Sequence, residues 1–298
     1  MAQPVRTLSD FLSRNGPVIR VTLTRVRGSS PRNEGTEMFV TRDRLWGTIG
    51  GGQLEFIAID RARDMLTGGV LNLDLDVPLG PEIGQCCGGR VELSLARMRR
   101  ADKHDALMRA QDQAAHLPHV YVMGAGHVGR ALADVFQHMP VRCILIDSRE
   151  EELTQCRADV ETRLSVIPEV DIANAPAGSA FVVLTHDHAL DFLLTLAALE
   201  KGDTAYVGMI GSATKRAKFR NWVRQHGDDH STEHLICPIG ASGSRDKRPS
   251  VIAAFVAAEV IADLTSETAA NPQQWDMGAP ITGNQSDRKD STALQARD

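Results

Sequence analysis

The sequence predicts an α/β protein in two parts: an N-terminal α/β domain followed by a doubly wound parallel sheet. The 298-residue chain is longer than one hydrophobic core usually supports. Its first part contains segments in which apolar and polar residues alternate, as in half-exposed strands. Its second part contains unbroken apolar runs separated by helical patterns, as expected for parallel strands buried on both faces.

Composition and charge exclude several classes of protein. The chain is 42% hydrophobic and 24% charged, which is typical of a globular protein. A net charge of −5 gives no basic field for nucleic acid or for an anionic membrane. No apolar run approaches the ~20 residues of a membrane span, and the opening "MAQPVRTLSDFLSRNG" lacks the pattern of a secretory signal. We therefore expect neither a nucleic-acid nor a membrane partner.

The cysteines predict a reducing compartment. Their number is odd and they have no framework spacing, so a disulfide scaffold is not indicated. We expect a cytoplasmic protein with five free thiols: Cys86, Cys87, Cys143, Cys156 and Cys237.

The N-terminal domain is predicted over residues 1–98. An amphipathic helix ends at Asn15-Gly16, and strand patterns follow it. Four glycines then lead into a second amphipathic helix. The predicted elements are helices over 8–14 and 53–66, and strands over 17–27, 36–41, 70–77 and 91–97. A charged helical segment over 99–117 connects this domain to the next.

The second domain is predicted over residues 118–266, with parallel strands joined by right-handed helical crossovers. Its four apolar runs are "HVYVMG", "CILID", "AFVVLT" and "AYVGMI". Residues 267–298 are polar and predict a tail without fixed structure.

The stretch "VYVMGAGHVGRALADVF" carries the strongest single motif. Gly124, Gly126 and Gly129 fit G-x-G-x-x-G after a buried strand and at the start of a helix, and Asp147 ends the next strand, where a ribose hydroxyl is expected. This pattern predicts a Rossmann-like domain that binds a phosphate-bearing ligand. The alternative is that the glycines only allow the strand and helix to pack closely.

Two further strand ends carry candidate site residues. In "THDH", His186 and His188 are candidate metal ligands or acid–base groups, whereas Thr185 or Asp187 is expected to cap the following helix, which stops at Lys201-Gly202. Gly211 and Ser212 open a helix with Lys215 and Arg216 in its first turns. That arrangement suits an anion, but a solvated basic face explains it equally well.

In the N-terminal domain, Gly50, Gly51 and Gly52 precede a helix that bears Gln53 and Glu55 in its first turn. Backbone amides at a helix start can bind a phosphate or the polar edge of a heterocycle. Three consecutive glycines cost conformational entropy that a simple turn does not require, which favours ligand contact.

Cys86 and Cys87 lie in a glycine turn before Gly88 and Gly89. The chain has no C-x-x-C pair, so neither a structural zinc site nor a thioredoxin-like pair is indicated. Soft thiolates suit soft or sulfur-rich partners. The alternative is two small buried residues in a tight turn.

Three stretches together resemble the XdhC/CoxI family of molybdenum-cofactor chaperones: "RGSSPRNEGTEMFVTRDRLWGTIGGGQLE", "LGPEIGQCCGGRVEL" and "VYVMGAGHVGRALA". The resemblance implies a non-enzymatic, commonly dimeric carrier. It would bind the molybdenum cofactor, protect it from oxidation, support its sulfuration by a cysteine desulfurase and deliver it to apo-xanthine dehydrogenase. The cofactor is expected in a cleft between the two domains.

Ligand softness and loop chemistry suggest roles for residues of this chain. The pterin phosphate suits a helix start, its heterocycle suits exposed backbone and Gln53, and its molybdenum–sulfur end suits Cys87 or Cys86. Cys87 is favoured because the wider family keeps Cys-Gly-Gly more faithfully than the doubled cysteine, and Ser30 is a further cofactor-binding candidate. Many members carry histidine where this chain has Gln53, so a role for that ring does not transfer. A competing hypothesis is an NAD(P)-dependent oxidoreductase that binds its cofactor at Gly124–Gly129 and Asp147. Its candidate catalytic groups are His186, Asp187 and His188. A third is a nucleotide at that site that regulates delivery.

Overall fold

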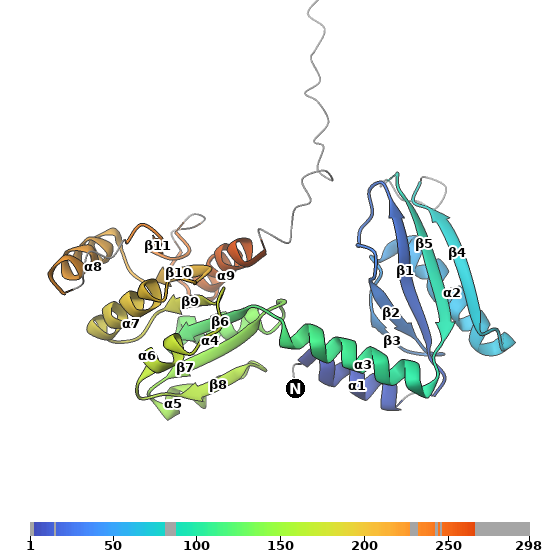
Figure 1. The fold of residues 1–298 in the computed structure, drawn as a ribbon, viewed down its shortest axis with the longest axis horizontal. Helices are drawn as coiled ribbons and strands as arrows, with labels where there is room; N and C mark the ends of the chain where they lie inside the picture. The colour runs from blue at the N-terminus through green and yellow to red at the C-terminus, as the bar shows by residue number, and fades with distance from the viewer. Residues whose placement is uncertain are drawn as a thin grey trace, which may run out of the picture.

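The computed structural model describes residues 3–14, 16–80, 88–226, 232–241, 244 and 246–265. They form two α/β domains that follow each other along the chain (Figure 1). The predicted tail, Cys86 and Cys87 lie outside the described residues.

The N-terminal domain is built on a five-stranded antiparallel sheet with the order β3-β2-β1-β5-β4. The apolar residues that alternate along β1, such as Ile19, Val21 and Leu23, are fully buried. The strands are β1 (Ile19–Arg27), β2 (Glu37–Val40), β3 (Leu45–Gly47), β4 (Asn72–Pro78) and β5 (Arg90–Arg97). The four predicted strands are confirmed, whereas the three-residue β3 was not predicted.

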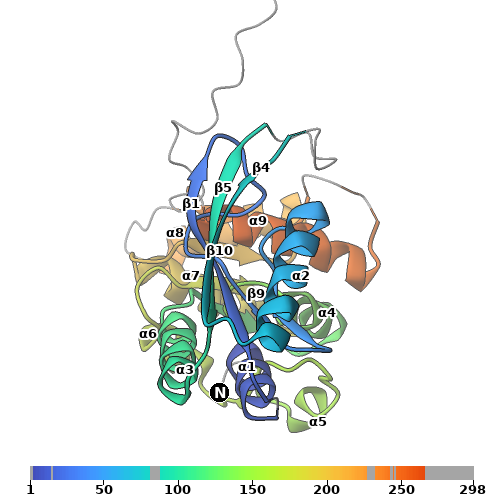
Figure 2. The same ribbon diagram turned by 90° about the vertical axis from the view of Figure 1, so that its right-hand side faces the viewer.

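Helix α2 (Gly52–Gly68) covers one face of this sheet (Figure 2). Leu54, Ala58, Ala62 and Met65 recur at helical spacing on its buried side and pack on the sheet. Helices α1 (Gln3–Arg14) and α3 (Arg100–Ala115) lie together at the base of the sheet. A second apolar cluster that includes Leu8, Phe39 and Ala106 joins them to it. The predicted connecting helix is therefore packed against the N-terminal domain.

The C-terminal domain contains a six-stranded parallel sheet with the order β11-β10-β9-β6-β7-β8. This order confirms the doubly wound, Rossmann-like fold. From β6 the sheet extends through β7 and β8 to one side, and from β9 through β10 and β11 to the other, so the strand order reverses between β6 and β9. The strands are β6 (His119–Met123), β7 (Arg142–Asp147), β8 (Glu161–Leu164), β9 (Ala180–Val183), β10 (Tyr206–Met209) and β11 (Leu235–Ile236). The sequence predicted four of them and missed the short β8 and β11.

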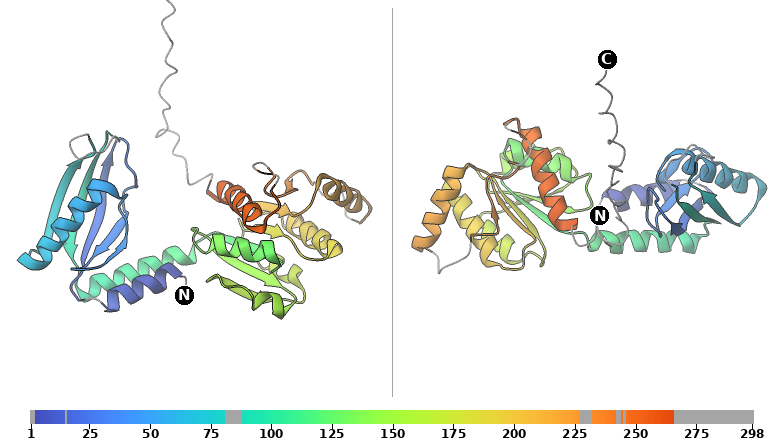
Figure 3. Two further views of the ribbon diagram at one scale, coloured as in Figure 1. Left: turned by 180° about the vertical axis from the view of Figure 1, so that it is seen from behind. Right: turned by 90° about the horizontal axis from the view of Figure 1, so that it is seen from above.

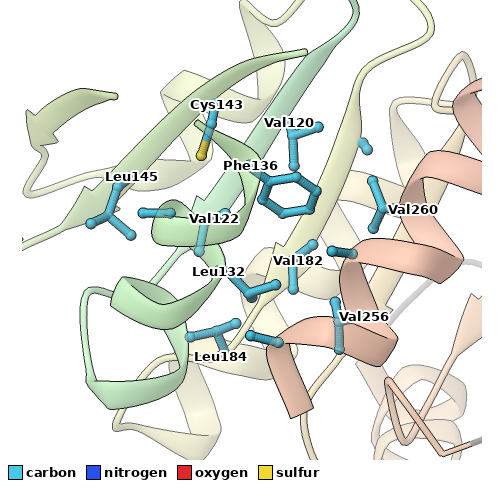
Figure 4. Close-up of a cluster of buried hydrophobic side chains, with 14 of the residues drawn as sticks. Val120, Val122, Leu132, Phe136, Cys143, Leu145, Val182, Leu184, Val256 and Val260 are labelled. Atoms are coloured by element: carbon cyan, nitrogen blue, oxygen red, sulfur yellow. The ribbon is translucent and has the colours of Figure 1, made fainter. Parts of the chain in front are cut away.

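Helices cover both faces of the parallel sheet (Figure 3). On one face, Val256 and Val260 pack with Leu132, Phe136 and the strand valines (Figure 4). On the other, Phe219 and Val223 pack with Leu194. The helices are α4 (His127–Phe136), α5 (Glu150–Leu153), α6 (Pro168–Ala173), α7 (His188–Glu200), α8 (Ala213–His226) and α9 (Pro249–Thr265). No described helix is long and apolar enough to cross a bilayer.

Candidate functional site

One loop of the N-terminal domain contacts two other glycine-containing loops. The three loops are residues 28–32, 47–52 and 88–89, together called the glycine-loop cluster here. A Cβ atom on Gly89 would lie 2.1 Å from the carbonyl oxygen of Ser29, and one on Gly50 would lie 2.4 Å from Cγ of Pro31. These two glycines are required because backbone and ring atoms fill the space that a side chain would need.

Two other glycines of the cluster have open space around them. Gly51 has a φ of 78° and Gly88 a φ of 65°, and a Cβ on either would meet nothing within 4 Å. Their positive φ favours glycine, and the absence of a side chain leaves backbone exposed. The structure thus brings the Ser30 loop beside the loops of Gly51 and Gly88, from which it is separated in the sequence.

Glu55 organises the loop before α2. Its Oε2 atom accepts hydrogen bonds from the Thr48 hydroxyl (2.6 Å), the Ile49 amide (3.2 Å) and the Gly51 amide (3.0 Å). The Gly50 amide donates to the Thr48 hydroxyl (3.1 Å). The loop amides that were expected to be bare therefore already have acceptors. The Glu55 carboxylate thus occupies the loop amides that precede α2, and not the first amides of the helix itself.

Gln53 is exposed, and among the described residues its side chain has no hydrogen-bond partner. The first four amides of a helix also lack intrahelical acceptors, so Gln53 and the start of α2 offer both donors and an acceptor. Phe56, one turn later, is 64% exposed. Sequence reasoning missed Phe56, because a single aromatic residue in an amphipathic helix gives no signal of its exposure.

The three fingerprint glycines of the C-terminal domain differ in whether packing requires glycine at their positions. A Cβ on Gly124 would lie 2.5 Å from the Leu184 carbonyl oxygen, and one on Gly129 would lie 1.9 Å from the Gly124 carbonyl oxygen. Both positions require glycine for packing. Gly126 has an ordinary φ of −66°, and a Cβ there would meet nothing within 4 Å. Packing therefore explains two of the three glycines and leaves Gly126 unexplained.

Asp147 does not present a free carboxylate. Its Oδ2 atom accepts from the Ala125 amide (2.7 Å), and both of its oxygens accept from the Arg149 side chain (3.0 Å each). Burial alone raises the pKa of a carboxyl, but the hydrogen bonds from Arg149 and Ala125 outweigh it and hold the pKa of Asp147 below its usual value. The ribose contact that was expected of Asp147 thus competes with an internal network.

The pocket beside the fingerprint is small. It is lined by residues that include Gly124, Asp147, Ser148, Thr185 and His186, and its volume is about 10 Å³. That is room for about one water molecule. The two cations nearest the fingerprint, Arg130 and Arg149, are paired with Glu152 and Asp147.

The "THDH" segment is a helix cap. Asp187 is the N-cap of α7 and accepts from the Ala189 amide (2.7 Å), so the capping interpretation is confirmed. His186 and His188 are exposed. Among the residues that the structure describes, no three histidine, cysteine or carboxylate side chains are placed to hold a metal ion.

A buried ion pair lies behind this cap, and sequence reasoning missed it. Asp191 is fully buried and accepts from the Thr185 amide (2.8 Å) and hydroxyl (2.7 Å), while its other oxygen pairs with Lys215. Lys215 passes over Gly211, where a Cβ would lie 2.7 Å from its Cδ. Ser212 caps α8 by accepting from the Lys215 amide (3.3 Å). Lys215 is thus committed to α7 and does not form a solvated basic face.

The pocket beside the fingerprint and the groove along α8 are both lined by residues of the C-terminal domain alone. The glycine-loop cluster and the fingerprint are treated as two candidate sites. A shared interdomain cleft stays a prediction.

Comparison with known proteins agrees with this architecture. The chain matches the XdhC Rossmann domain over residues 120–260 and the XdhC and CoxI family over residues 11–73. No curated protein matches the sequence.

Among solved structures, a xanthine dehydrogenase from Bacillus halodurans is similar in fold, with a TM-score of 0.74 and 16% identity over 91% of this chain and 99% of that one. The GsuK RCK domain aligns with a TM-score of only 0.30, at 17% identity over 90% of this chain and 52% of that one. On the two family matches, the chain belongs to the XdhC and CoxI family.

Proposed function

We propose that this protein is a non-enzymatic carrier of the molybdenum cofactor. Membership of the XdhC and CoxI family implies a role in the maturation of xanthine dehydrogenase. In the proposed role the chain binds the cofactor, shields it from oxidation, supports its sulfuration by a cysteine desulfurase and delivers it to apo-xanthine dehydrogenase. The cofactor is cargo, a phosphorylated pterin whose dithiolene holds the metal.

The observation that carries this proposal is the glycine-loop cluster, in which backbone without side chains is exposed. Gly51 and Gly88 leave space at the cluster, and Gln53 presents an unpaired amide beside it. A pterin heterocycle has both donors and acceptors along its edge, which a glutamine side chain and free helix amides complement. The pterin phosphate is assigned to the first amides of α2, because Glu55 already occupies those of Ile49 and Gly51.

The oxidoreductase alternative fits the C-terminal domain less well. A dinucleotide needs a free acidic residue for the ribose and space for its pyrophosphate. Asp147 is bound by Ala125 and Arg149, and the adjoining pocket holds about one water molecule. Hydride transfer there would require the Asp147–Arg149 network to open first.

Cofactor retention tests the proposal. The protein is purified from a host that makes the cofactor and from one that does not, and each sample is denatured, oxidised and assayed for pterin fluorescence. We expect fluorescence only from the first host, and a clear loss in Gln53→Ala but not in Asp60→Ala. Asp60 is an exposed residue two turns further along α2, so Asp60→Ala controls for the loss of an exposed polar side chain from the same helix. Equal fluorescence from both hosts, or no fluorescence from either, contradicts the proposal.

A further inference from the structure

A groove along α8 is lined by cationic side chains that no function assigned above uses. Its volume is about 450 Å³, and its lining includes Arg216, Arg220, Arg224, Asn221, Cys237 and Pro238. This volume is typical of small-molecule sites. Helix α8 lies at the edge of the C-terminal domain beside β10 and β11 (Figure 1), several strands away from the fingerprint between β6 and α4.

Helix α8 is strongly positive, although the protein as a whole is negative. The helix carries five cations and no carboxylate, "ATKRAKFRNWVRQH", although the protein has a net charge of −5. Lys215 is neutralised by Asp191. Among the described residues no carboxylate pairs with Arg216, Arg220 or Arg224, although most other arginines that the structure describes lie in ion pairs.

Arg216 adds a second, independent observation. Its Nε atom is buried and has no hydrogen-bond partner among the described residues. A buried donor without an acceptor costs free energy, and an anionic oxygen in the groove would supply the acceptor. Arg216 also lies in the first turns of α8, where the helix dipole favours negative charge.

The spacing of the arginines indicates the kind of anion. Arg216, Arg220 and Arg224 follow one another at four-residue intervals on one face of the helix. With a rise of 1.5 Å per residue, they span about 12 Å of helix axis. Three guanidinium groups along one helix face complement a ligand that carries several linked anionic groups. Guanidinium binds phosphate in bidentate geometry. A single phosphate monoester would leave most of the row unused.

The remaining walls are uncharged. Ala213, Ala217, Cys237 and Pro238 line the groove beside the arginines. Burial raises the pKa of the Cys237 thiol, and its neighbours Lys215 and Arg216 only partly offset this, so the thiol is neutral at pH 7. These walls suit the less polar part of a phosphorylated small molecule.

From this juxtaposition of a row of arginines, a buried unsatisfied guanidinium donor and a groove of ligand size, we propose that α8 binds an oligophosphate. The ligand is a small molecule with two or more linked phosphates, either free or attached to a nucleoside. This site is distinct from the proposed cofactor site and does not depend on it. An acidic protein segment is the competing occupant, and competition with a polyglutamate peptide distinguishes the two.

Titration calorimetry on the full-length protein with inorganic tripolyphosphate tests the site, with ATP, adenosine and orthophosphate as further probes. We expect saturable tripolyphosphate binding that weakens as salt rises. ATP but not adenosine should compete for it, and orthophosphate should bind much less tightly. Tighter binding of ATP than of tripolyphosphate identifies a nucleotide ligand, and the reverse identifies a free oligophosphate.

Variants locate the binding on the groove. Arg220 and Arg224 are exposed, so Arg220→Gln and Arg224→Gln are expected to fold, and each should weaken tripolyphosphate binding by about tenfold. Lys218→Gln removes the same charge from the same helix outside the groove and should weaken binding less than about threefold. Equal losses in Lys218→Gln and Arg220→Gln overturn the proposal. So does an absence of saturable binding, loss of binding in Gly126→Ala alone, or tighter binding of a polyglutamate peptide of equal charge.

Discussion

The two fingerprint glycines Gly126 and Gly129 are predicted to respond in opposite ways to the same substitution. In Gly129→Ala the added Cβ would lie 1.9 Å from the Gly124 carbonyl oxygen, whereas carbon–oxygen contacts normally begin at about 3.3 Å. The start of α4 would therefore have to move by about 1.4 Å from the end of β6. The obstructing atom belongs to the backbone, so no side-chain rotation relieves the clash.

The magnitude follows from the cost of overpacking a core. Inserted carbon atoms typically cost 1–3 kcal/mol, and a fixed backbone obstacle places Gly129→Ala near the upper end, at about 3 kcal/mol. For a domain of this size that is a fall in Tm of about 6–12 °C. In Gly126→Ala the φ of −66° is ordinary and the space is open. A small entropic gain offsets the weaker N-cap, so its stability should stay within about 1 kcal/mol of the wild type.

Thermal unfolding followed by circular dichroism measures both variants under one set of conditions. If Gly129→Ala melts within 2 °C of the wild type, the close contact between α4 and β6 is wrong. If Gly126→Ala is destabilised as much as Gly129→Ala, the open space described at Gly126 is wrong.

Three further predictions concern the Asp191–Lys215 pair, the Asp147 network and the cysteines Cys86 and Cys87. Lys215→Ala leaves the buried Asp191 carboxylate without its cation, so its free energy of unfolding should fall by about 3 kcal/mol, while the exposed Lys218→Ala changes it by less than about 0.5 kcal/mol; equal effects in urea unfolding would contradict the pairing. The pKa of Asp147 is lowered in the folded state, so its contribution to stability is present above the unfolded pKa of about 4 and is lost as the pH falls through the folded value. Asp147→Asn should therefore be less stable than the wild type by about 1–3 kcal/mol at pH 7 and approach it at pH 2–3; a constant difference across this range refutes the assignment. Cys87→Ala should retain less pterin than Cys86→Ala, and wild-type retention in both variants, measured by pterin fluorescence, excludes thiol contact.

Much of the fold was predictable because its signals are local. Alternation in β1 and unbroken apolar runs in β6, β7, β9 and β10 report burial on one face or on two. β3 and β11 were missed because strands of three and two residues are too short to show a period. β8 is as long as β9 and β10, but its sequence ETRL carries charged residues in place of an unbroken apolar run. Their pairing depends on neighbours that are distant in the sequence.

The sequence predicted which residues form the candidate sites better than it predicted the hydrogen-bond partners of those residues. Glycine runs located the loops and the fingerprint, but the sequence does not reveal which amides are already bound. Glu55 and Asp147 were expected to face a ligand. Glu55 instead accepts hydrogen bonds from its own loop, and Asp147 accepts from the neighbouring β6–α4 loop and from Arg149. The Asp191–Lys215 pair joins residues 24 positions apart, and only the packing of α7 against α8 brings them together.

Transfer of the cofactor to the client enzyme tests the central claim most directly. Protein purified with bound pterin is mixed with apo-xanthine dehydrogenase, and pterin on each protein and xanthine oxidation are followed together. The account predicts that activity appears as pterin leaves this chain, and that Gln53→Ala restores less activity than Asp60→Ala. If the chain never carries pterin, or if activity is the same with and without it, the protein is not a carrier.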